Sequence, residues 1–316
     1  MKKILLVLAA TSMTMAAQAK ILRVSNVAGS SAPYTTFEAA HDAASSGDTI
    51  MLDASAKAYG DEFGRATITK SLVILGPGYW LVENGIVEEG AGAAQFSGLT
   101  IKADGTVVKG MWLSQCNIEA SKVVINRCRL SNSTSGIIFK SGFSNCIISQ
   151  NIISGGIGTS GGTGSFSTNH QITNNIFTVS MMGNGFSQMK DCYIAYNTFR
   201  TNEFHLNNVL NSTVEYNLWK EYKESAIASS EGCSVANNYE TAVVNTQATN
   251  AFIDKDYYDA IEYPADVRAT YGAFAGDSPY ILSGIPSGPI IQDLIVPTTV
   301  EKGSTMSVTV KVGVVK

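Results

Sequence analysis

The sequence predicts an all-β protein, a parallel β-helix, from three observations. An eight-residue motif recurs at intervals of roughly 20 to 24 residues through the middle of the chain, a period typical of repeat architectures. Only 15% of the 316 residues are charged, well below the roughly 25% of an average soluble domain. Glycine is frequent, with 29 residues, and proline is scarce, with 7. A weakly charged, turn-rich chain with a short repeat is typical of stacked short strands.

The amino terminus has the three-part form of a secretory signal peptide. Residues 1–19 begin with two lysines, continue with the apolar stretch Ile4–Ala10 and end in the small-x-small sequence Ala17–Ala19. This pattern predicts cleavage before Lys20 and export to the periplasm, the cell surface or the medium. No later stretch has 18 continuous apolar residues, so no membrane span is expected.

A short helix is expected next, followed by the first strand. Within Tyr34–Asp48, Thr35 or Thr36 can act as the N-cap and Gly47 can end the helix. Its predicted apolar face is Ala39, Ala40, Ala43 and Ala44. Such a helix would cap the first coil and protect an exposed sheet end. Thr49–Leu52 then begins the strands.

The repeat itself predicts the coils. Each motif has a small residue or Cys first, Ile or Val third, Asn sixth and an apolar residue eighth, with the asparagines at Asn151, Asn175, Asn197, Asn217 and Asn238. Weaker copies start near Leu72, Leu99 and Val123, and the last of these has Cys128 in the Asn position. A unit of this length fits three short strands and three turns.

The motif positions also predict the interior of the coil. The third-position residues should point inward, as should Phe177, Phe199 and Trp219 after the turn. The recurring Asn should bend the chain, because Asn tolerates left-handed backbone angles. Equivalent asparagines should stack and hydrogen-bond along the axis. Eight coils spaced about 4.8 Å apart would form a rod of roughly 38 Å.

The five cysteines are predicted to be free and buried. Cys146, Cys192 and Cys233 occupy the first motif position. Cysteines two coils apart would be about 9.6 Å from each other, too far for a disulfide. Their spacing matches no zinc motif, and we expect neither a metal nor a cofactor.

The carboxyl-terminal stretch has a different pattern. Met306–Val312 alternates with a period of two, which predicts a half-buried strand. The chain therefore divides into a signal peptide (1–19), a β-helix with its caps (20–288) and a β tail (289–316).

Three segments carry a family resemblance. Phe37–Ala44 with Gly47–Ile50, and then Ile68–Gly78, resemble the opening of pectin lyase-like right-handed β-helix proteins, and Gly272–Pro286 resembles the closing segment of secreted bacterial members. With the coils, the resemblance covers about residues 21–290. It implies a right-handed β-helix and carbohydrate as the ligand class.

Motifs of known activities are missing from the sequence. It lacks the Asn-Thr-Asp, Asp-Asp, Gly-His-Gly and Arg-x-Lys motifs by which polygalacturonases resemble one another. The adjacent acids Asp61 and Glu62 are interpreted as solvated loop charge. Asp254 and Asp256 are spaced like two calcium ligands but lack a third. A net charge of −4 without a basic cluster argues against a nucleic-acid partner.

One charged group could support catalysis. Arg200, Glu203 and His205 follow one Asn turn, and an outward His beside Glu and Arg could perform acid–base chemistry on a glycan. The alternative interpretation is a solvated face with incidental charges. Additional ligand contacts are expected from Lys140, Lys223 and Glu224 on neighbouring coils.

Aromatic residues provide a second candidate. Tyr196 and Tyr216 precede the Asn of adjacent coils, and Trp219 lies close by. Exposed rings offer the flat apolar faces that sugars bind, although stacking within the turns of the fold is an alternative.

These observations favour an exported protein that binds polysaccharide or a cell-surface glycan, with catalysis not evident. The first alternative is a carbohydrate-active enzyme, such as a polysaccharide lyase with His205 or an adjacent Arg or Lys as base, or else a glycoside hydrolase. The second is a structural or adhesive surface protein. The oligomeric state stays open.

Overall fold

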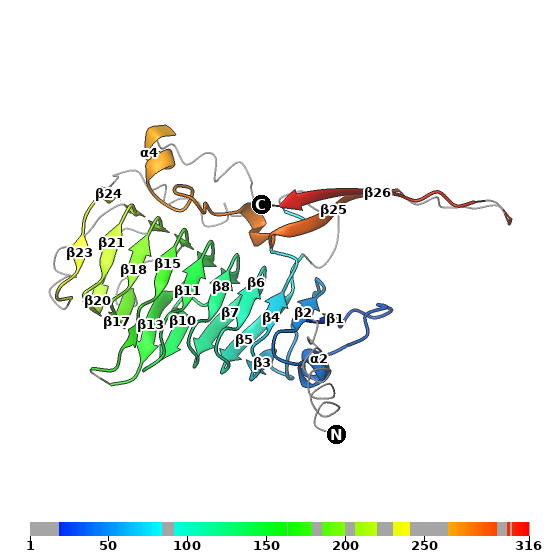
Figure 1. The fold of residues 1–316 in the computed structure, drawn as a ribbon, viewed down its shortest axis with the longest axis horizontal. Helices are drawn as coiled ribbons and strands as arrows, with labels where there is room; N and C mark the ends of the chain where they lie inside the picture. Colours follow the sequence, from blue (N-terminus) through cyan, green and yellow to red (C-terminus); the bar gives the residue numbers. More distant parts are fainter. Residues whose placement is uncertain are drawn as a thin grey trace, which may run out of the picture.

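The chain folds into an elongated parallel β-solenoid (Figure 1). The structure, a computed structural model, describes residues 19–83, 92–162, 164–178, 185–199, 206–219, 230–240, 265–295, 302–303 and 305–315. Within these ranges every strand pair is parallel except β25 with β26. The prediction of an all-β chain with stacked parallel strands is confirmed.

One sheet of ten strands runs along the whole solenoid. Its strands are, in order, β1 (Ile21–Val24), β2 (Thr49–Leu52), β4 (Val73–Leu75), β6 (Val107–Lys109), β8 (Val124–Asn126), β11 (Ile147–Ser149), β15 (Gln171–Thr173), β18 (Tyr193–Ala195), β21 (Thr213–Glu215) and β23 (Ser234–Val235). The middle residues are in register, which stacks an inward row of Ile50, Ile74, Val108, Ile125, Ile148, Ile172, Ile194, Val214 and Val235. This row is the core that the third motif position predicts.

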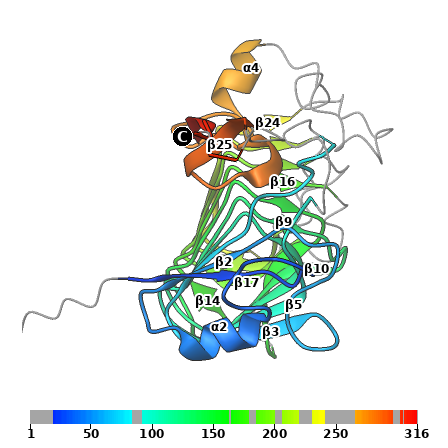
Figure 2. The same cartoon turned by 90° about the vertical axis from the view of Figure 1, so that its right-hand side faces the viewer.

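The second sheet supplies the other two faces of each coil (Figure 2). One face, called here the open face, contains β3 (Arg65–Ile68), β5 (Gln95–Ile101), β7 (Trp112–Ile118), β10 (Ser135–Lys140), β13 (Gly156–Ser160), β17 (Phe186–Lys190) and β20 (Leu206–Leu210), with the short β14 (Ser167–Thr168) beside β17. The other face contains β9 (Arg129–Leu130), β12 (Ile152–Ile153), β16 (Ile176–Phe177), β19 (Thr198–Phe199), β22 (Leu218–Trp219) and β24 (Tyr239–Glu240). Strand β7 is long enough to pair with both β9 and β10.

The recurring asparagines form the expected ladder. Nδ2 of Asn151 donates to Oδ1 of Asn175 at 2.9 Å, and the same bond links Asn175, Asn197, Asn217 and Asn238 at 3.0 Å. Each amide also donates to a carbonyl of an earlier strand, as Asn175 does to Ile148 O. The ladder thereby pairs the polar groups that the turn places inside the core.

The left-handed residue of each turn is not the ladder Asn, so that part of the prediction is wrong. The positive φ belongs to the residue before it, with angles between 53° and 57° at Gln150, Asn174, Tyr196, Tyr216 and Asn237. Arg127, with φ 55°, has the same place before Cys128, which occupies the Asn position of its coil. The ladder requires the Asn side chain to point inward, and the preceding residue takes the sharp bend. We call these residues the turn row.

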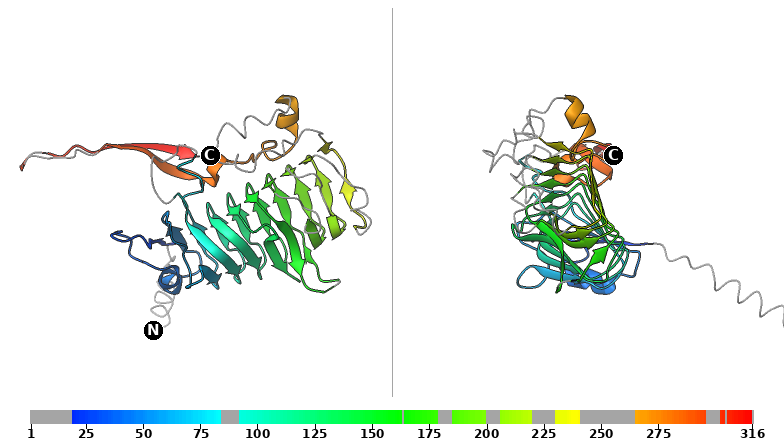
Figure 3. Two further views of the ribbon diagram at one scale, coloured as in Figure 1. Left: turned by 180° about the vertical axis from the view of Figure 1, so that it is seen from behind. Right: turned by 90° about the vertical axis from the view of Figure 1, so that its left-hand side faces the viewer.

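A segment from the carboxyl-terminal region, residues 271–286, lies along the turn row and is called here the strap (Figures 1 and 3). It runs back towards the first coils: Gly272 N–H donates to Tyr216 O, and Arg127 Nη1 donates to Ile285 O. Its buried residues share a second apolar cluster with the solenoid surface, made of Tyr79, Trp80, Ala93, Ile152, Ile176, Ala273 and Tyr280.

The tail forms a hairpin of β25 (Gly288–Ile295) and β26 (Thr309–Val315), which pair antiparallel. The observed strand starts at Thr309, later than the alternation from Met306 predicts. Met306 and Val308, which precede this strand, are 51% and 42% exposed. The hairpin projects past the first coils (Figure 1), and among the described strands β25 and β26 pair only with each other.

Near the amino-terminal end, α2 (Phe37–Ala43) contacts β1, β2 and β3. Thr36 is its N-cap and accepts from Ala39 N–H. The buried side is Phe37, Ala40, His41 and Ala44, whereas Ala39 and Ala43 are exposed, so the predicted alanine face is half wrong. Phe37 is the largest apolar residue of the helix, and its burial rotates the helix. Within the part of the chain described, no helix is long and apolar enough to span a membrane.

All five cysteines are free, as predicted, and only Cys233 is not fully buried. Burial raises the pKa of the Cys128 thiol to about 12 and those of Cys146 and Cys192 to about 11. They pack as small apolar groups.

Candidate functional site

The predicted charged group is not among the described residues. Arg200, Glu203, His205, Lys223 and Glu224 all lie outside the described ranges, as do Asp254 and Asp256. Their roles stay predictions.

Lys140 lies at the end of β10 on the open face. Its Nζ is 3.4 Å from Oε2 of Glu119, and its side chain is 59% exposed. The turn row, which carries the tyrosines, is at a different corner of the coil. Lys140 and the aromatic candidates therefore do not share a site.

The two candidate tyrosines stack on each other. The rings of Tyr196 and Tyr216 are 5.1 Å apart and nearly parallel. Gly276 of the strap packs so closely that a Cβ there would lie 3.3 Å from the Tyr196 ring, and Tyr271 lies 6.4 Å from Tyr216. These rings are engaged within the fold, which is the alternative that the sequence left open.

Trp219 points into the solenoid. It is 3% exposed, and its ring lies 6.4 Å from that of Phe199. Its inward direction agrees with the predicted core and is incompatible with a sugar-binding surface, because a ligand cannot reach it from solvent.

A different part of the molecule is concave. A groove of about 820 Å³ lies between α2 and the outer surface of β3, β5 and β7, near the amino-terminal end of the open face. Its volume is in the range of small-molecule and glycan sites, roughly 300–1,000 Å³. The groove is lined by Phe37, Glu38, His41, Asp42, Asp61, Arg65, Ala66, Thr67, Ser97, Gly98, Thr100, Gln115 and Asn117.

The groove floor consists of side chains that strand pairing aligns in rows. Thr67 pairs with Thr100, which pairs with Asn117, so three polar residues form one row across β3, β5 and β7. A second row contains Arg65, Gly98 and Gln115. Residues of a row repeat about every 4.8 Å along the axis. Gly98 has no side chain, so the groove is deeper at this position. A Cβ there would lie 3.4 Å from Arg65 Cγ, an ordinary van der Waals contact.

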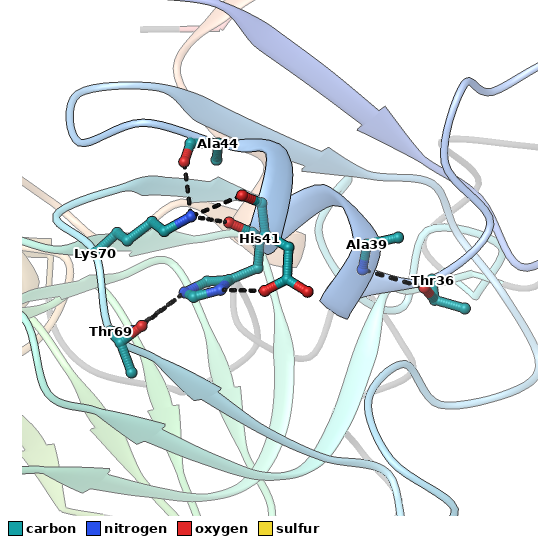
Figure 4. A network of polar contacts seen from close by, with 7 residues as sticks. Thr36, Ala39, His41, Ala44, Thr69 and Lys70 are labelled. Carbon is teal, nitrogen blue, oxygen red and sulfur yellow. Dashed lines mark hydrogen bonds and ion pairs between the residues drawn. The ribbon is translucent and has the colours of Figure 1, made fainter.

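One wall of the groove is α2, where His41 is held by the backbone (Figure 4). Thr69 N–H donates to His41 Nε2 at 3.1 Å, so the neutral ring carries its proton on Nδ1. That nitrogen lies 3.9 Å from Asp42 Oδ1. Burial first, and Lys70 second, lower the pKa of His41. The ring is therefore neutral at pH 7.

Lys70 binds the carboxyl-terminal end of the same helix (Figure 4). Its Nζ donates to the carbonyl oxygens of His41, Asp42 and Ala44 at 2.7, 2.9 and 2.8 Å. A cation at a helix C-terminus offsets the negative end of the helix dipole. The charge of Lys70 therefore stabilises the carboxyl-terminal end of α2.

The opposite wall contains Asp61 and Arg65. Asp61 accepts the backbone N–H groups of Phe63 and Arg65, both at 2.9 Å, and these bonds lower its pKa. The Arg65 guanidinium lies 3.3 Å from Asp61 Oδ2 and 4.7 Å above the Phe63 ring. Phe63 is 61% exposed but does not line the groove, so this wall presents the Asp61 carboxylate and the Arg65 guanidinium.

The arrangement offers many hydrogen-bonding groups and little acid–base chemistry. Asp61 is held as a carboxylate and His41 as a neutral ring, so neither is poised to exchange a proton near pH 7. Among the described residues, no group of three or more His, Cys, Asp or Glu could hold a metal ion. The lining is suited to binding a polyhydroxylated molecule.

The open face has a second hollow further along. It measures about 180 Å³ over β10, β13 and β17. The outward row that begins at Thr67 continues there through Asn117, Ile138, Gly158, Ser187 and Asn207. A third hollow, of about 440 Å³, lies on the other side of Phe37, between residues 25–36 and 57–60.

Sequence reasoning missed the groove. The repeat is strongest in the regular coils, whereas Asp61 lies in loop-like sequence before them. The available signals were two acids one helical turn apart, Glu38 and Asp42, and outward polar residues in the early strands, such as Thr67 and Thr100.

The chain matches no known protein family, and neither a curated protein nor a solved structure matches it.

Proposed function

We propose that this is an exported glycan-binding protein that holds a polysaccharide or cell-surface glycan in the groove between α2 and β3, β5 and β7. One observation carries the proposal: the groove combines two in-register rows of hydroxyl, amide and guanidinium groups with carboxylates from its walls. Sugars present closely spaced hydroxyls that both donate and accept, and such a lining can pair with them.

The finer fold assignment belongs to the same proposal. We infer a right-handed, pectin lyase-like β-helix whose first coil is capped by α2 and whose residues 1–19 are a signal peptide. Crossovers between parallel strands are right-handed in about 98% of cases. Phe37 and Ala40 of α2 belong to the solenoid core cluster, as a cap requires.

The groove favours binding over catalysis. A polysaccharide lyase needs a base beside the sugar, whereas Nε2 of His41 is engaged by Thr69 N–H and the lowered pKa of Asp61 makes its carboxylate a weak base. Binding without product release is therefore expected. Release of unsaturated products from an acidic polysaccharide would support the enzyme alternative.

The test is glycan binding by paired variants of one surface row. Asn117 lies in the groove, and Asn207 occupies the same outward row on β20, outside the groove. We expect Thr100→Ala with Asn117→Ala to weaken binding of an array-selected oligosaccharide at least tenfold, since two hydrogen bonds are worth about 1 kcal/mol each. Asn207→Ala should change affinity less than twofold. A silent array, or equal losses in both variants, would overturn the proposal.

A further inference from the structure

The groove carries an excess of negative charge. Its lining contains three carboxylates, Glu38 and Asp42 on α2 and Asp61 on the opposite wall, against one guanidinium, Arg65. The whole chain has only 26 acids in 316 residues, so three around one groove is a local concentration. Any glycan that enters must be compatible with this field.

The nearby cations are already paired with groups of the protein. Arg65 lies 3.3 Å from Asp61 and above the Phe63 ring. Lys70 directs its Nζ to three helix carbonyls. His41 accepts a backbone N–H and adds no charge. In the described parts of the chain, no lysine or arginine is within ion-pair distance of Glu38 or Asp42.

The two helix carboxylates are held in an unfavourable arrangement. Glu38 and Asp42 are one helical turn apart and share one side of α2, where like charges repel. Asp42 also lies in the last turn, where Lys70 offsets the negative end of the helix dipole, so the repulsion that remains is the one from Glu38. Its side chain is 86% exposed, so a ligand can reach it. A bound cation would relieve the repulsion between Glu38 and Asp42.

We propose that the groove selects a glycan bearing free amino groups and discriminates against one bearing carboxylates. The proposal rests on the proposed glycan function and names its ligand class. The concave floor of Thr67, Thr100 and Asn117 binds the sugar hydroxyls, and Glu38 and Asp42 bind the ammonium group. A uronate in the same place would put a fourth carboxylate among three, which opposes binding.

The test compares three oligosaccharides of equal length by calorimetry: glucosamine oligomers with free amines, their N-acetylated forms and oligogalacturonate. We expect the free-amine form to bind about three- to fivefold more tightly than the acetylated form, the upper end of what one exposed charge pair contributes. Oligogalacturonate should bind most weakly. Raising the ionic strength from 0.01 M to 1 M should shrink the difference, because the Debye length falls from about 30 Å to about 3 Å.

A matched pair of variants tests whether Glu38 and Asp42 cause the preference for free amines. E38Q with D42N should bring the affinities for the two glucosamine forms to within twofold of each other. Glu231→Gln removes an exposed acid on the last described coil and should leave the preference unchanged. Both sets of residues are at the surface, so circular dichroism should show an intact fold.

The outcomes separate this inference from the function on which it rests. If the acetylated form binds through Asn117 but free amines give no preference, the inference is wrong and the proposed function stands. A preference that survives E38Q with D42N, or that Glu231→Gln also removes, overturns the inference as well. If none of the three glycans binds and the array is silent, the proposed function itself fails.

Discussion

Gln150 and Pro279 are 129 residues apart in the sequence, yet Gln150 Nε2 donates to Pro279 O at 2.6 Å. The bond is one of a series along the strap: Arg127 donates to Ile285 O, and Asn174 donates to the carbonyls of Ala273 and Ala275. Solenoid stability is approximately a sum of coil terms and nearest-neighbour terms. The strap adds contacts between coils that are not neighbours, and so makes unfolding more cooperative.

The contribution of the strap can be measured at Asn174. Asn174→Gly keeps the left-handed backbone at φ 55° and removes both bonds to the strap. We expect a loss of about 2 kcal/mol in the free energy of unfolding, at about 1 kcal/mol for each bond. Hydrogen exchange of residues 271–286 should accelerate first.

Asn237→Gly is the matched control, because Asn237 has the same left-handed conformation, with φ 53°, and is exposed. It should change stability by less than about 0.5 kcal/mol, as surface substitutions usually do. Equal losses in the two variants would show that the strap bonds do not stabilise the solenoid.

The asparagine ladder predicts a gradient of mutational cost along the axis. Asn197 is fully buried, donates to Ile172 O and Asn217 Oδ1, and accepts from Asn175. Asn197→Ala leaves several buried groups unpaired and should cost at least about 3 kcal/mol. Asn238→Ala, at the half-buried end of the ladder, should cost less than half as much. Urea unfolding measures both, and similar costs would contradict a cooperative ladder.

His170 predicts a pH dependence of stability. Its Nδ1 accepts Cys146 N–H, its ring stacks on Phe139, and burial lowers its pKa to about 4. The unfolded state, with a pKa near 6.5, binds the proton more tightly between these values. Stability should therefore be full above pH 6.5 and fall by about 3 kcal/mol as the pH drops to 4.

His170→Gln isolates the contribution of His170 to the pH dependence. His41 also has a lowered pKa, but it contributes equally to the wild-type protein and the variant. The variant should lose most of the slope between pH 6.5 and 4 in a series of urea titrations. An unchanged slope would mean that His170 is not held neutral in the folded state.

The thiols should be inert in the native protein. Burial raises the pKa of Cys128 to about 12 and that of Cys146 to about 11, so little thiolate exists at pH 8. Iodoacetamide should label Cys233, which is half-buried, and leave the other four unmodified. Non-reducing mass spectrometry that found a Cys146–Cys192 crosslink would contradict the observed spacing.

Local patterns predicted the coils well, because the repeat places Ile148, Ile172 and Ile194 at equivalent positions. The ladder followed from the same spacing. The groove could not be predicted in this way. Thr67 and Thr100 are separated by more residues than any two successive ladder asparagines. Thr100 and Asn117 are separated by fewer residues than any two successive ladder asparagines. Neither spacing fits the period of the repeat, so their alignment appears only when the strands pair.

The turn row shows a second limit of sequence reasoning. The turn row contains residues as different as Arg127, Gln150 and Tyr196. Their common role, to contact the strap or each other, depends on a segment far away in the chain, as in the bond from Asn174 to Ala273. The sequence offers the stacking of Tyr196 on Tyr216 as an alternative, but it does not predict the strap residue Gly276 that packs against Tyr196.

The most direct test of a glycan site in the groove is photo-crosslinking with an oligosaccharide that carries free amines and a diazirine. Peptide mass spectrometry then locates the labels. Gly98 has room for a Cβ and lies on the groove floor, so Gly98→Leu should fill the groove without unfolding the protein. We expect labels on the peptides that contain Glu38–Asp42, Asp61–Thr67, Ser97–Thr100 and Gln115–Asn117, and their loss in Gly98→Leu. Labels concentrated on the Tyr196 and Tyr216 turns, or unchanged labelling in Gly98→Leu, would contradict a glycan site in the groove.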